Sequence, residues 1–340
     1  MFFRFATYLN MVIFFARKVL FCFLVFNISV PSPCFASELP TIKVSALEFG
    51  TINWVLQTIK RTQLDKQNGF NLTVHPVAST QAGKIALQAN AADIIISDWI
   101  WVARLRGNQQ TSFSFAPYSS ATGGIMVSKR SPITQLSDLA HKKIGIAGGP
   151  LDKNWLLLQV LALKQNIHLN DRAHTVFGAP PLLNNLFKQG EMDALVNFWH
   201  YNARLKADGY VEFTTTQKII EQLGIKNHIP MLGYVFRPTW AHNNSLVLNS
   251  FLNVSQQASL LLCHSDPHWT AILPLTRTDN VSTQALLREG FCKGRITHFS
   301  DDGKHAVARI YSMLADIGGE QLTGPTSWLD PDLFWPLPSP

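Results

Sequence analysis

Aromatic and acidic side chains gather directly after the strand-like runs of this 340-residue sequence. Aromatic faces bind flat rings and cations through stacking and cation–π attraction. Arginine is missing from these segments, although a bare sulfonate or nitrate is usually held by arginine or by several unopposed donors. The pattern indicates a flat organic ligand that is zwitterionic or cationic, with core packing beneath the first helical turns as the alternative interpretation. The side chains concerned are Trp54, Trp99, Trp101, Trp155, Trp199, Glu48 and Asp98.

Catalytic motifs are scarce in the sequence. It contains no Gly-x-Ser-x-Gly elbow, no Gly-x-x-x-x-Gly-Lys-Ser/Thr loop and no His-Glu-x-x-His motif. His200 could act as a base, but a lone histidine in a cleft more often makes a hydrogen bond to a ligand. We therefore predict a binding protein rather than an enzyme, with no cofactor and no metal.

Strand-like and helix-like runs alternate over the first part of the chain. The expected strands are 41–47, 71–77 and 93–97, and the expected helices are 53–67, 81–90 and 99–106. Such alternation predicts a parallel sheet that is covered by helices on both faces.

The alternation is interrupted where two extended segments, 113–117 and 124–127, follow one another with no helix between them. A second alternating series starts at residue 143, and the extended segment 230–236 can serve as a return crossing. The pattern predicts two lobes joined by two crossings. The remaining predictions are strands at 143–147, 173–177, 194–197 and 211–214, helices at 152–165, 181–189, 203–207, 247–263, 282–289 and 304–317, and an extended surface tail at 329–340.

The candidate site follows from where ligands bind in open α/β sheets. They bind beyond the carboxyl ends of the strands, where helix N-termini offer free N–H groups and the positive end of a dipole. An ordinary helix cap is the alternative for Ser79 and Thr80, and a plain tight turn for Gly149. The candidate ligand-binding residues are Glu48, Trp54, Ser79, Thr80, Asp98, Trp99, Thr122, Gly149, Asn154, Asn197, Trp199 and His200.

The first 36 residues differ in composition from the rest. They contain Arg4, Arg17 and Lys18, no acidic residue, an apolar run at 19–26, and an exit that ends at Ala36. This is the layout of a secretory signal peptide that is cleaved after Ala36. An uncleaved anchor helix is the alternative, because residues 2–15 add a second apolar stretch. Either Met1 or Met11 is the start.

The charge of the remaining chain is only mildly positive. The whole sequence has 29 basic and 22 acidic residues, and the first 36 residues hold three of the basic ones, which leaves a formal charge of +4. Apart from Lys129-Arg130 and Lys142-Lys143 the basic residues are dispersed. This pattern does not indicate a nucleic-acid partner, which would require clustered lysine and arginine.

Two cysteines remain after the signal peptide is removed, Cys263 and Cys292. An even pair in an exported chain predicts one disulfide bond, which closes a loop of about 30 residues. A metal site is the alternative, because His264 and His268 lie beside Cys263, but the spacing matches no strong zinc pattern.

Two local motifs and the order of elements resemble a known family. The segment 137–146, Ser-Asp-Leu-Ala-His-Lys-Lys-Ile-Gly-Ile, is similar to that family's Asp-Leu-x-Gly-Lys-x-Ile-Gly start of lobe two, with Ala140-His141 as a departure. The segment 186–194, Leu-Phe-Lys-Gln-Gly-Glu-Met-Asp-Ala, is similar to its Leu-x-x-Gly-x-x-Asp-Ala turn. Over about residues 40–320 the chain resembles the periplasmic solute-binding proteins of nitrate, taurine and alkanesulfonate ABC importers.

The resemblance implies an α/β, bilobal periplasmic-binding-protein fold of type II, in which two doubly wound lobes are joined by a two-strand hinge. Residues 1–36 would be the signal peptide, 37–122 and 232–340 lobe one with the C-terminal helices, and 123–231 lobe two. The implied protein is a periplasmic monomer that captures a small organic ligand, nitrogenous or sulfonated, for an inner-membrane ABC permease. The alternatives are a periplasmic accessory protein of a dehydrogenase and an enzyme similar to thiamin-pyrimidine synthases.

Overall fold

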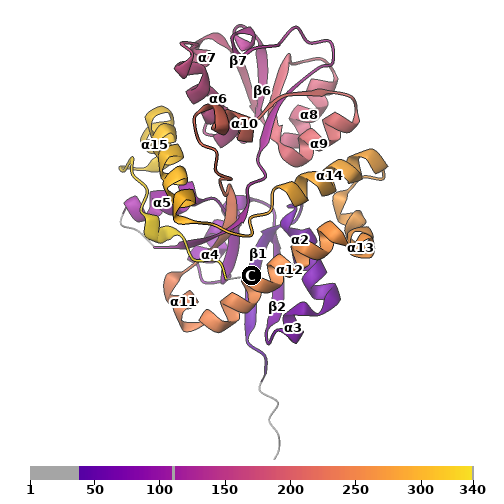
Figure 1. Ribbon diagram of the computed structural model, residues 1–340, viewed down its shortest axis with the longest axis vertical. Helices are drawn as coiled ribbons and strands as arrows, with labels where there is room; N and C mark the ends of the chain where they lie inside the picture. The colour runs from indigo at the N-terminus through magenta and orange to yellow at the C-terminus, as the bar shows by residue number, and fades with distance from the viewer. Residues whose placement is uncertain (1–37, 109–111, 339–340) are drawn as a thin grey trace, which may run out of the picture. The chain divides into compact units, whose positions relative to one another are not determined.

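The computed structural model describes residues 38–108 and 112–338. The predicted signal peptide, the alternative start at Met11 and the cleavage position after Ala36 lie outside the described residues. Within residues 39–340, which form one compact unit, the strands make two five-stranded sheets. We call the sheet that holds the first strands lobe one and the other sheet lobe two (Figure 1).

Lobe one contains short runs of Ile, Val and Leu that are buried in its sheet. Its strands are β1 (Thr41–Leu47), β2 (Asn71–Val77), β3 (Ile94–Ser97), β4 (Ser114–Ser119) and β10 (Leu232–Phe236). The order is β2-β1-β3-β10-β4. β1 pairs in parallel with β2 and β3, whereas β10 is antiparallel to β3 and β4. The sheet is therefore mixed, because β10 is the strand by which the chain returns from lobe two.

Lobe two repeats this arrangement. Its strands are β5 (Gly123–Val127), β6 (Lys143–Ala147), β7 (His174–Gly178), β8 (Ala194–Phe198) and β9 (Val211–Thr215). They lie in the order β7-β6-β8-β5-β9, with β5 antiparallel to β8 and β9. Gly123 opens β5, and a Cβ there would lie 2.0 Å from the carbonyl oxygen of Asn197. Glycine is thus required where the first crossing joins the second sheet.

Helices lie between the strands of both lobes, and most of them begin just after a strand ends. In lobe one they are α2 (Ile52–Thr62), α3 (Leu64–Gln67), α4 (Thr80–Gln88) and α5 (Trp99–Gly107). In lobe two they are η1 (Leu136–Leu139), α6 (Lys153–Lys164), α7 (Leu169–Arg172), α8 (Pro180–Lys188), α9 (Trp199–Ala207) and α10 (Thr216–Gln222). The predicted bilobal α/β architecture is confirmed.

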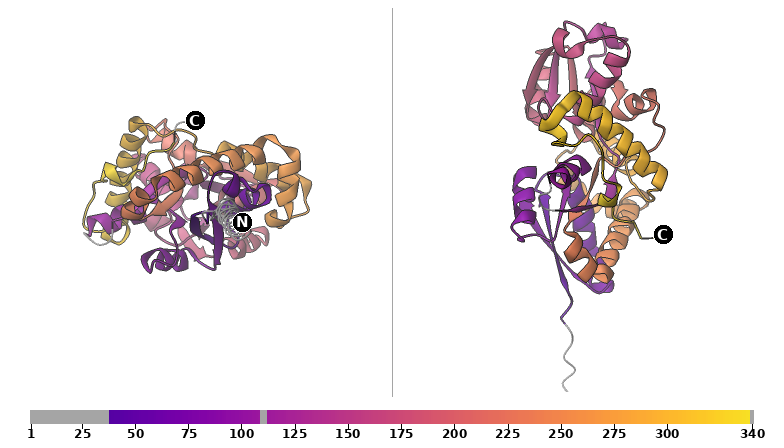
Figure 2. Two further views of the ribbon diagram at one scale, coloured as in Figure 1. Left: turned by 90° about the horizontal axis from the view of Figure 1, so that it is seen from below. Right: turned by 90° about the vertical axis from the view of Figure 1, so that its left-hand side faces the viewer.

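The C-terminal helices contact both sheets. They are α11 (Pro238–Asn243), α12 (Ser245–His264), α13 (Asp266–Thr276), α14 (Val281–Lys293) and α15 (Asp301–Thr323), followed by η2 (Pro331–Leu333). α12 packs on α2, but α14 also packs on α9, and α15 packs on both α5 and α6 (Figure 2). One apolar cluster accordingly joins Ile95 and Trp99, Ile144 and Leu157, and Tyr311 of α15. The last helices thus do more than return to lobe one, since they also link the two lobes.

Several predicted boundaries shift for local reasons. The helix expected at 53–67 is divided into α2 and α3 because Gln63 adopts the left-handed conformation, with φ 56°. α9 starts at Trp199 rather than at 203, so residues 199–202, which lie outside the expected helix, form its first turn. The prediction of a surface tail is wrong in part, because Leu333 and Phe334 are buried and the Trp335 N–H donates to the Phe115 carbonyl of β4 at 2.9 Å.

α12 is the one helix of the described residues that is long and apolar enough to cross a membrane, judged by length and composition. Its apolar side is buried through Leu248, Phe251 and Leu252. Ser255 on the same helix makes a hydrogen bond with the Tyr234 hydroxyl of β10. These contacts are those of a core helix in lobe one.

A disulfide bond joins Cys263 at the end of α12 to Cys292 at the end of α14, as predicted. The metal alternative is excluded at this position, because a sulfur atom in a disulfide is not a thiolate ligand. The neighbouring His268 ring instead shares a hydrogen bond of 2.7 Å with the Ser265 hydroxyl. The bond therefore fixes the helical hairpin that carries α14 toward lobe two.

Candidate functional site

Helix starts from both lobes meet at one ion pair. The Lys153 ammonium, in the first turn of α6, lies 3.9 Å from a carboxylate oxygen of Asp98, the residue that caps α5. The same ammonium donates to the Met231 carbonyl at 3.3 Å, on the return crossing. The two side chains are partly exposed, at 20% and 27%. Lys153 thus connects a lobe-two helix, a lobe-one helix and the hinge.

A second lysine adds positive charge at the same place. Lys84 of α4 lies with its ammonium 4.9 Å from the centre of the Trp101 ring. Burial by itself raises the pKa of the Asp98 carboxyl, but Lys153 and Lys84 hold that pKa below its ordinary value. Asp98 is therefore charged at neutral pH. Burial lowers the pKa of Lys84, an effect that Asp98 opposes in part.

The start of α6 is fixed by a network of hydrogen bonds. The Asp152 carboxylate accepts from the N–H groups of Asn154 at 2.9 Å and Trp155 at 3.2 Å. Burial raises the pKa of Asp152 to about 6 despite these bonds and the nearby Lys153. The Asn154 side-chain oxygen accepts from the Thr216 hydroxyl at 2.7 Å. Asn154, a predicted site residue, is thus 5% exposed and engaged in positioning α6.

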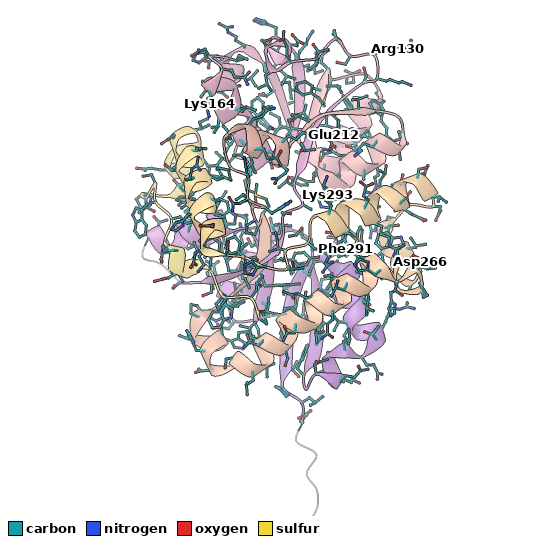
Figure 3. The ribbon with its side chains drawn as sticks, in the orientation of Figure 1. Arg130, Lys164, Glu212, Asp266, Phe291 and Lys293 are labelled. Atoms are coloured by element: carbon teal, nitrogen blue, oxygen red, sulfur yellow. A yellow bond between two sulfur atoms is a disulfide. The ribbon has the colours of Figure 1, made fainter. Side chains whose placement is uncertain are left out.

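Trp54 and Trp199 meet between the lobes. Their rings are 6.2 Å apart in an edge-to-face arrangement, and Trp54 also contacts Trp269 and Phe291 at 5.5 and 5.7 Å. Trp54 is only 4% exposed. The Trp199 N–H donates to the Thr122 carbonyl at 2.7 Å, which fixes the start of α9 beside the first crossing. The geometry favours packing between lobes for Trp54 and leaves Trp199 half-buried. Phe291, which contacts Trp54, lies on α14 (Figure 3).

His200 lies in an aromatic cluster beside Trp199. Its ring centre is 4.5 Å from that of Tyr201, and its Nδ1 atom is buried without a hydrogen-bond partner among the described residues. Burial, together with Arg204, lowers the pKa of His200 to about 3. The imidazole is therefore neutral at physiological pH and can accept or donate one hydrogen bond.

Two further predicted residues are engaged within the fold. Trp99 is fully buried, and its ring N–H donates to the Pro230 carbonyl at 2.6 Å. Asn197 is also fully buried, and it donates to the Asn184 side chain at 2.7 Å while accepting from the Phe198 N–H at 2.8 Å. These contacts favour the packing interpretation for Trp99, and Asn197 orients the start of α9.

The remaining predicted residues are more accessible. The Ala82 N–H donates to the Ser79 hydroxyl at 3.1 Å, so Ser79 caps α4, and Thr80 is exposed. Gly149 has φ +92° in an open turn, with no atom within 4 Å of an added Cβ. Glu48 lies 4.0 Å from Arg277 on the surface. Their ligand role stays a prediction.

Lys84 and Lys153 are not among the candidate site residues that the sequence predicts. We call the group of Lys84, Asp98 and Lys153 the interlobe site. Lys153 did carry a signal, because a cation in the first turn of a helix opposes the helix dipole unless an anion lies nearby. Lys84 carried no such signal, since a lysine within an amphipathic helix is typical of ordinary solvated surface. No cluster of metal-ligating residues occurs in residues 38–108 and 112–338.

The architecture has clear structural relatives. The aliphatic sulfonate-binding protein SsuA of Escherichia coli superposes with a TM-score of 0.68 at 14% identity, covering 85% of this chain and 95% of that one. The alkanesulfonate-binding SsuA of Xanthomonas axonopodis pv. citri, bound to MOPS, gives 0.63 at 16% identity, with 88% and 99% covered. A cysteine-to-serine mutant of DszB, in complex with biphenyl-2-sulfinic acid, gives 0.59 at 13% identity, with 87% and 96% covered.

No protein-family description matches the chain. No curated protein matches it either. The likeness to the solved structures thus establishes the fold: it is the bilobal periplasmic-binding-protein fold, shared by sulfonate-binding proteins and by the desulfurization enzyme DszB.

Proposed function

We propose that this chain is the periplasmic solute-binding component of an ABC importer and captures a small organic ligand between its lobes. The observation that carries the proposal is the pair of Lys153 and Asp98, which joins helix starts of the two lobes at 3.9 Å. A ligand bound there contacts both lobes and the return crossing at once. Such a ligand stabilises the closed form by its higher affinity for that form.

The charges of the interlobe site define the ligand class. Two lysines and the starts of α5 and α6 supply positive potential, and Asp98 supplies one negative charge. A zwitterion meets both requirements, with its anionic group toward Lys84 and Lys153 and its cationic group toward Asp98. The absence of arginine from the candidate segments argued against a sulfonate ligand. The two lysines weaken that argument, because a lysine ammonium binds an anion as a point charge. Amino-sulfonates and nitrogenous acids are therefore the first compounds to test.

The role requires no chemical step. Closure around the ligand would create the surface that an inner-membrane permease recognises, so binding alone suffices for function. The chain would act as a monomer in the periplasm, after removal of the signal peptide that the sequence predicts. The disulfide bond between Cys263 and Cys292 is compatible with that oxidising compartment.

Thermal shift of the mature protein tests the proposal. The panel would contain amino-sulfonates, alkanesulfonates, quaternary amines, nitrogenous heterocycles and thiamin precursors. A true ligand at 100 times its dissociation constant should add about 2.7 kcal/mol of stability. Lys153→Met and Asp98→Ala should abolish this gain. Lys164→Met is the matched control, because Lys164 is exposed at the other end of the same helix (Figure 3) and should leave the gain unchanged.

The competing functions make different predictions. An accessory protein of a dehydrogenase would be encoded beside that enzyme rather than beside permease and ATPase genes. An enzyme would turn over the compound that stabilises it, which mass spectrometry of the recovered ligand would detect. Residues 38–340 contain no free thiol that could act as a nucleophile, because both cysteines there form the disulfide. The transport role is supported if the ligand recovered from the wild-type protein is unaltered and if the Lys153→Met variant no longer binds it.

A further inference from the structure

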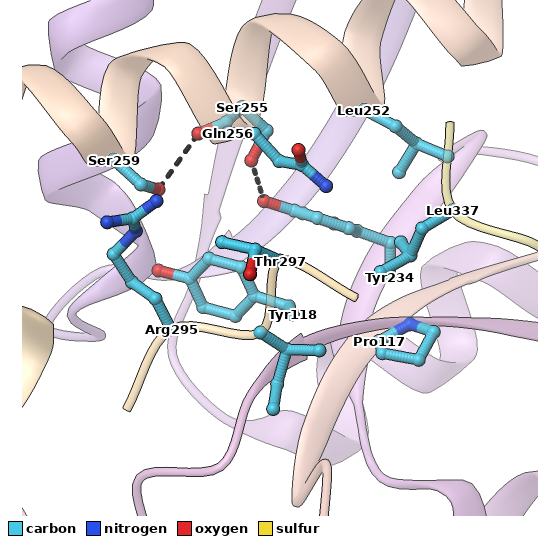
Figure 4. Close-up of a pocket in the computed structure, with 11 residues that line it drawn as sticks. Pro117, Tyr118, Tyr234, Leu252, Ser255, Gln256, Ser259, Arg295, Thr297 and Leu337 are labelled. Atoms are coloured by element: carbon cyan, nitrogen blue, oxygen red, sulfur yellow. Dashed lines mark hydrogen bonds between the residues drawn. The ribbon is translucent and has the colours of Figure 1, made fainter. Parts of the chain in front are cut away.

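A small polar cavity lies beside the first crossing, and none of the residues of the interlobe site lines it. Its water-accessible volume is about 20 Å³, and its polar lining comes from β4, β10, α12 and the segment after α14 (Figure 4). One water-sized centre needs roughly 10–15 Å³ of such volume. The cavity therefore has room for one small species. Its main polar residues are Tyr118, Ser255, Gln256, Ser259, Arg295 and Thr297.

Two polar groups in this lining are buried without a partner among the described residues. They are the Tyr118 hydroxyl and the side-chain nitrogen of Gln256. The other buried hydroxyls are satisfied, since Tyr234 pairs with Ser255 and Ser259 donates to the Ser255 carbonyl. Burial raises the pKa of Tyr118, so its hydroxyl stays protonated and can donate. A buried donor without an acceptor destabilises the folded protein, so each of these two groups needs an acceptor.

Arg295 brings a positive charge to the same cavity. Within the described residues its guanidinium makes no ion pair within 4.0 Å and no side-chain hydrogen bond within 3.5 Å. No aspartate or glutamate lines the cavity. Burial lowers the pKa of Arg295, although an arginine remains charged at any physiological pH. A half-buried cation with no carboxylate beside it is costly unless an anion compensates the charge.

We propose that this cavity binds a small monovalent anion of halide size. Arg295 supplies the compensating charge, the Tyr118 hydroxyl donates a hydrogen bond, and the Gln256 amide offers a further donor. The volume of about 20 Å³ excludes the organic ligand of the interlobe site. This is therefore a second site, and its anion is distinct from the transported ligand.

The position of the anion links it to the hinge. The Ser120 N–H donates to the Gly294 carbonyl at 2.7 Å, and the Ile296 N–H donates to the Tyr118 carbonyl at 3.3 Å. Ser119 and Arg295 also form an isolated antiparallel bridge. The segment after α14 thus runs against the first crossing. An anion between Arg295 and Tyr118 would hold these two segments together beside the pivot of the lobes.

Bromide replaces chloride in such sites and is visible by anomalous diffraction. Crystals of the mature protein soaked in sodium bromide should show an anomalous peak between Arg295 and Tyr118. In solution, sodium chloride and sodium bromide should raise the melting temperature by about 2 °C or more over sodium gluconate at equal ionic strength, with saturation. Arg295→Gln and Tyr118→Phe should lose this anion-specific rise. Arg130→Gln, at an exposed arginine of lobe two, should keep it.

The outcomes separate this site from the transport proposal. If a soaked wild-type crystal shows no bromide peak in the cavity, the cavity binds water rather than an anion and the proposal is overturned. This result holds even if Arg295→Gln fails to fold. An equal halide rise in Arg295→Gln and wild type does the same. Neither result bears on binding at the interlobe site, which Lys153→Met tests separately.

Discussion

Replacing Gly290 by alanine tests the contact between α14 and α9. A Cβ at Gly290 would lie 2.8 Å from Cε3 and 2.9 Å from Cζ3 of Trp199, whereas carbon atoms pack best at about 3.5–4.0 Å. The indole has little room to move. Trp54 lies against it edge-to-face at 6.2 Å, and the Trp199 peptide N–H is bound to Thr122. The substitution should therefore push the two helices apart.

Two opposing effects decide the magnitude. Alanine is favoured over glycine inside a helix by about 1 kcal/mol. Overpacking of a well-packed contact costs about 1–3 kcal/mol. Gly290→Ala should consequently lower the free energy of unfolding by up to about 2 kcal/mol, measured by urea titration of the mature protein with tryptophan fluorescence and circular dichroism.

Gly83→Ala is the matched control, because Gly83 also lies inside a helix, α4. There the nearest atom to an added Cβ is Val77 Cγ2 at 3.7 Å, an ordinary contact. This variant should gain up to about 1 kcal/mol from helix propensity alone. If Gly290→Ala is stabilised as much as Gly83→Ala, the tight contact between Trp199 and α14 does not exist and the described approach of the lobes is wrong.

Three further predictions concern the disulfide, acid stability and export. Cys263→Ala/Cys292→Ala should lose about 3–4 kcal/mol of unfolding free energy relative to the oxidised protein, because the bond closes a loop of 29 residues; a loss below about 1 kcal/mol would contradict this. Because burial and Arg204 lower the pKa of His200 to about 3, the unfolded chain takes up a proton below pH 6.5 that the folded chain does not. The stability that neutral His200 contributes is thus lost as the pH falls from about 6.5 toward 3. His200→Gln should therefore show a smaller drop in melting temperature between pH 7 and pH 4.5 than the wild type. An equal drop would refute the lowered pKa of His200. N-terminal sequencing of periplasmic protein should begin at Ser37 or within about two residues of it, and a full-length chain in the cytoplasm would refute the signal peptide.

The strands could be predicted from the sequence because each is a short apolar run with turn residues at its ends. The predicted boundaries 41–47, 71–77 and 143–147 agree with β1, β2 and β6 residue by residue. Helix starts were harder to place. Trp199-His200-Tyr201 lacks the side-chain cap that marks the start of α5 at Asp98, so the start of α9 was expected four residues late. The two crossings between the lobes could also be predicted. No helix lies between the extended segments 113–117 and 124–127, and 230–236 is a further extended segment by which the chain returns.

Burial of the tryptophans could not be predicted, because it depends on chain segments far away. Trp54 is covered by Trp269 and Phe291, more than 200 residues later, and Trp99 is covered by Tyr311. Position after a strand is shared by residues that face a ligand and by residues beneath the first turn of a helix. Periodicity over a few residues does not separate these two environments, whereas the C-terminal helices decide between them.

The pair of Lys153 and Asp98 is a contact between the lobes that the proposed ligand would strengthen. With a nitrogen–oxygen distance of 3.9 Å and both side chains partly exposed, this ion pair adds little to the apolar contacts that join the lobes. Lys153 also stands in the first turn of α6, where the helix dipole disfavours a cation. An anionic group placed beside Lys153 relieves that unfavourable position and adds a second partner for the ammonium. A ligand with such a group would therefore add to the contacts that α14, α15 and the shared apolar cluster already make between the lobes.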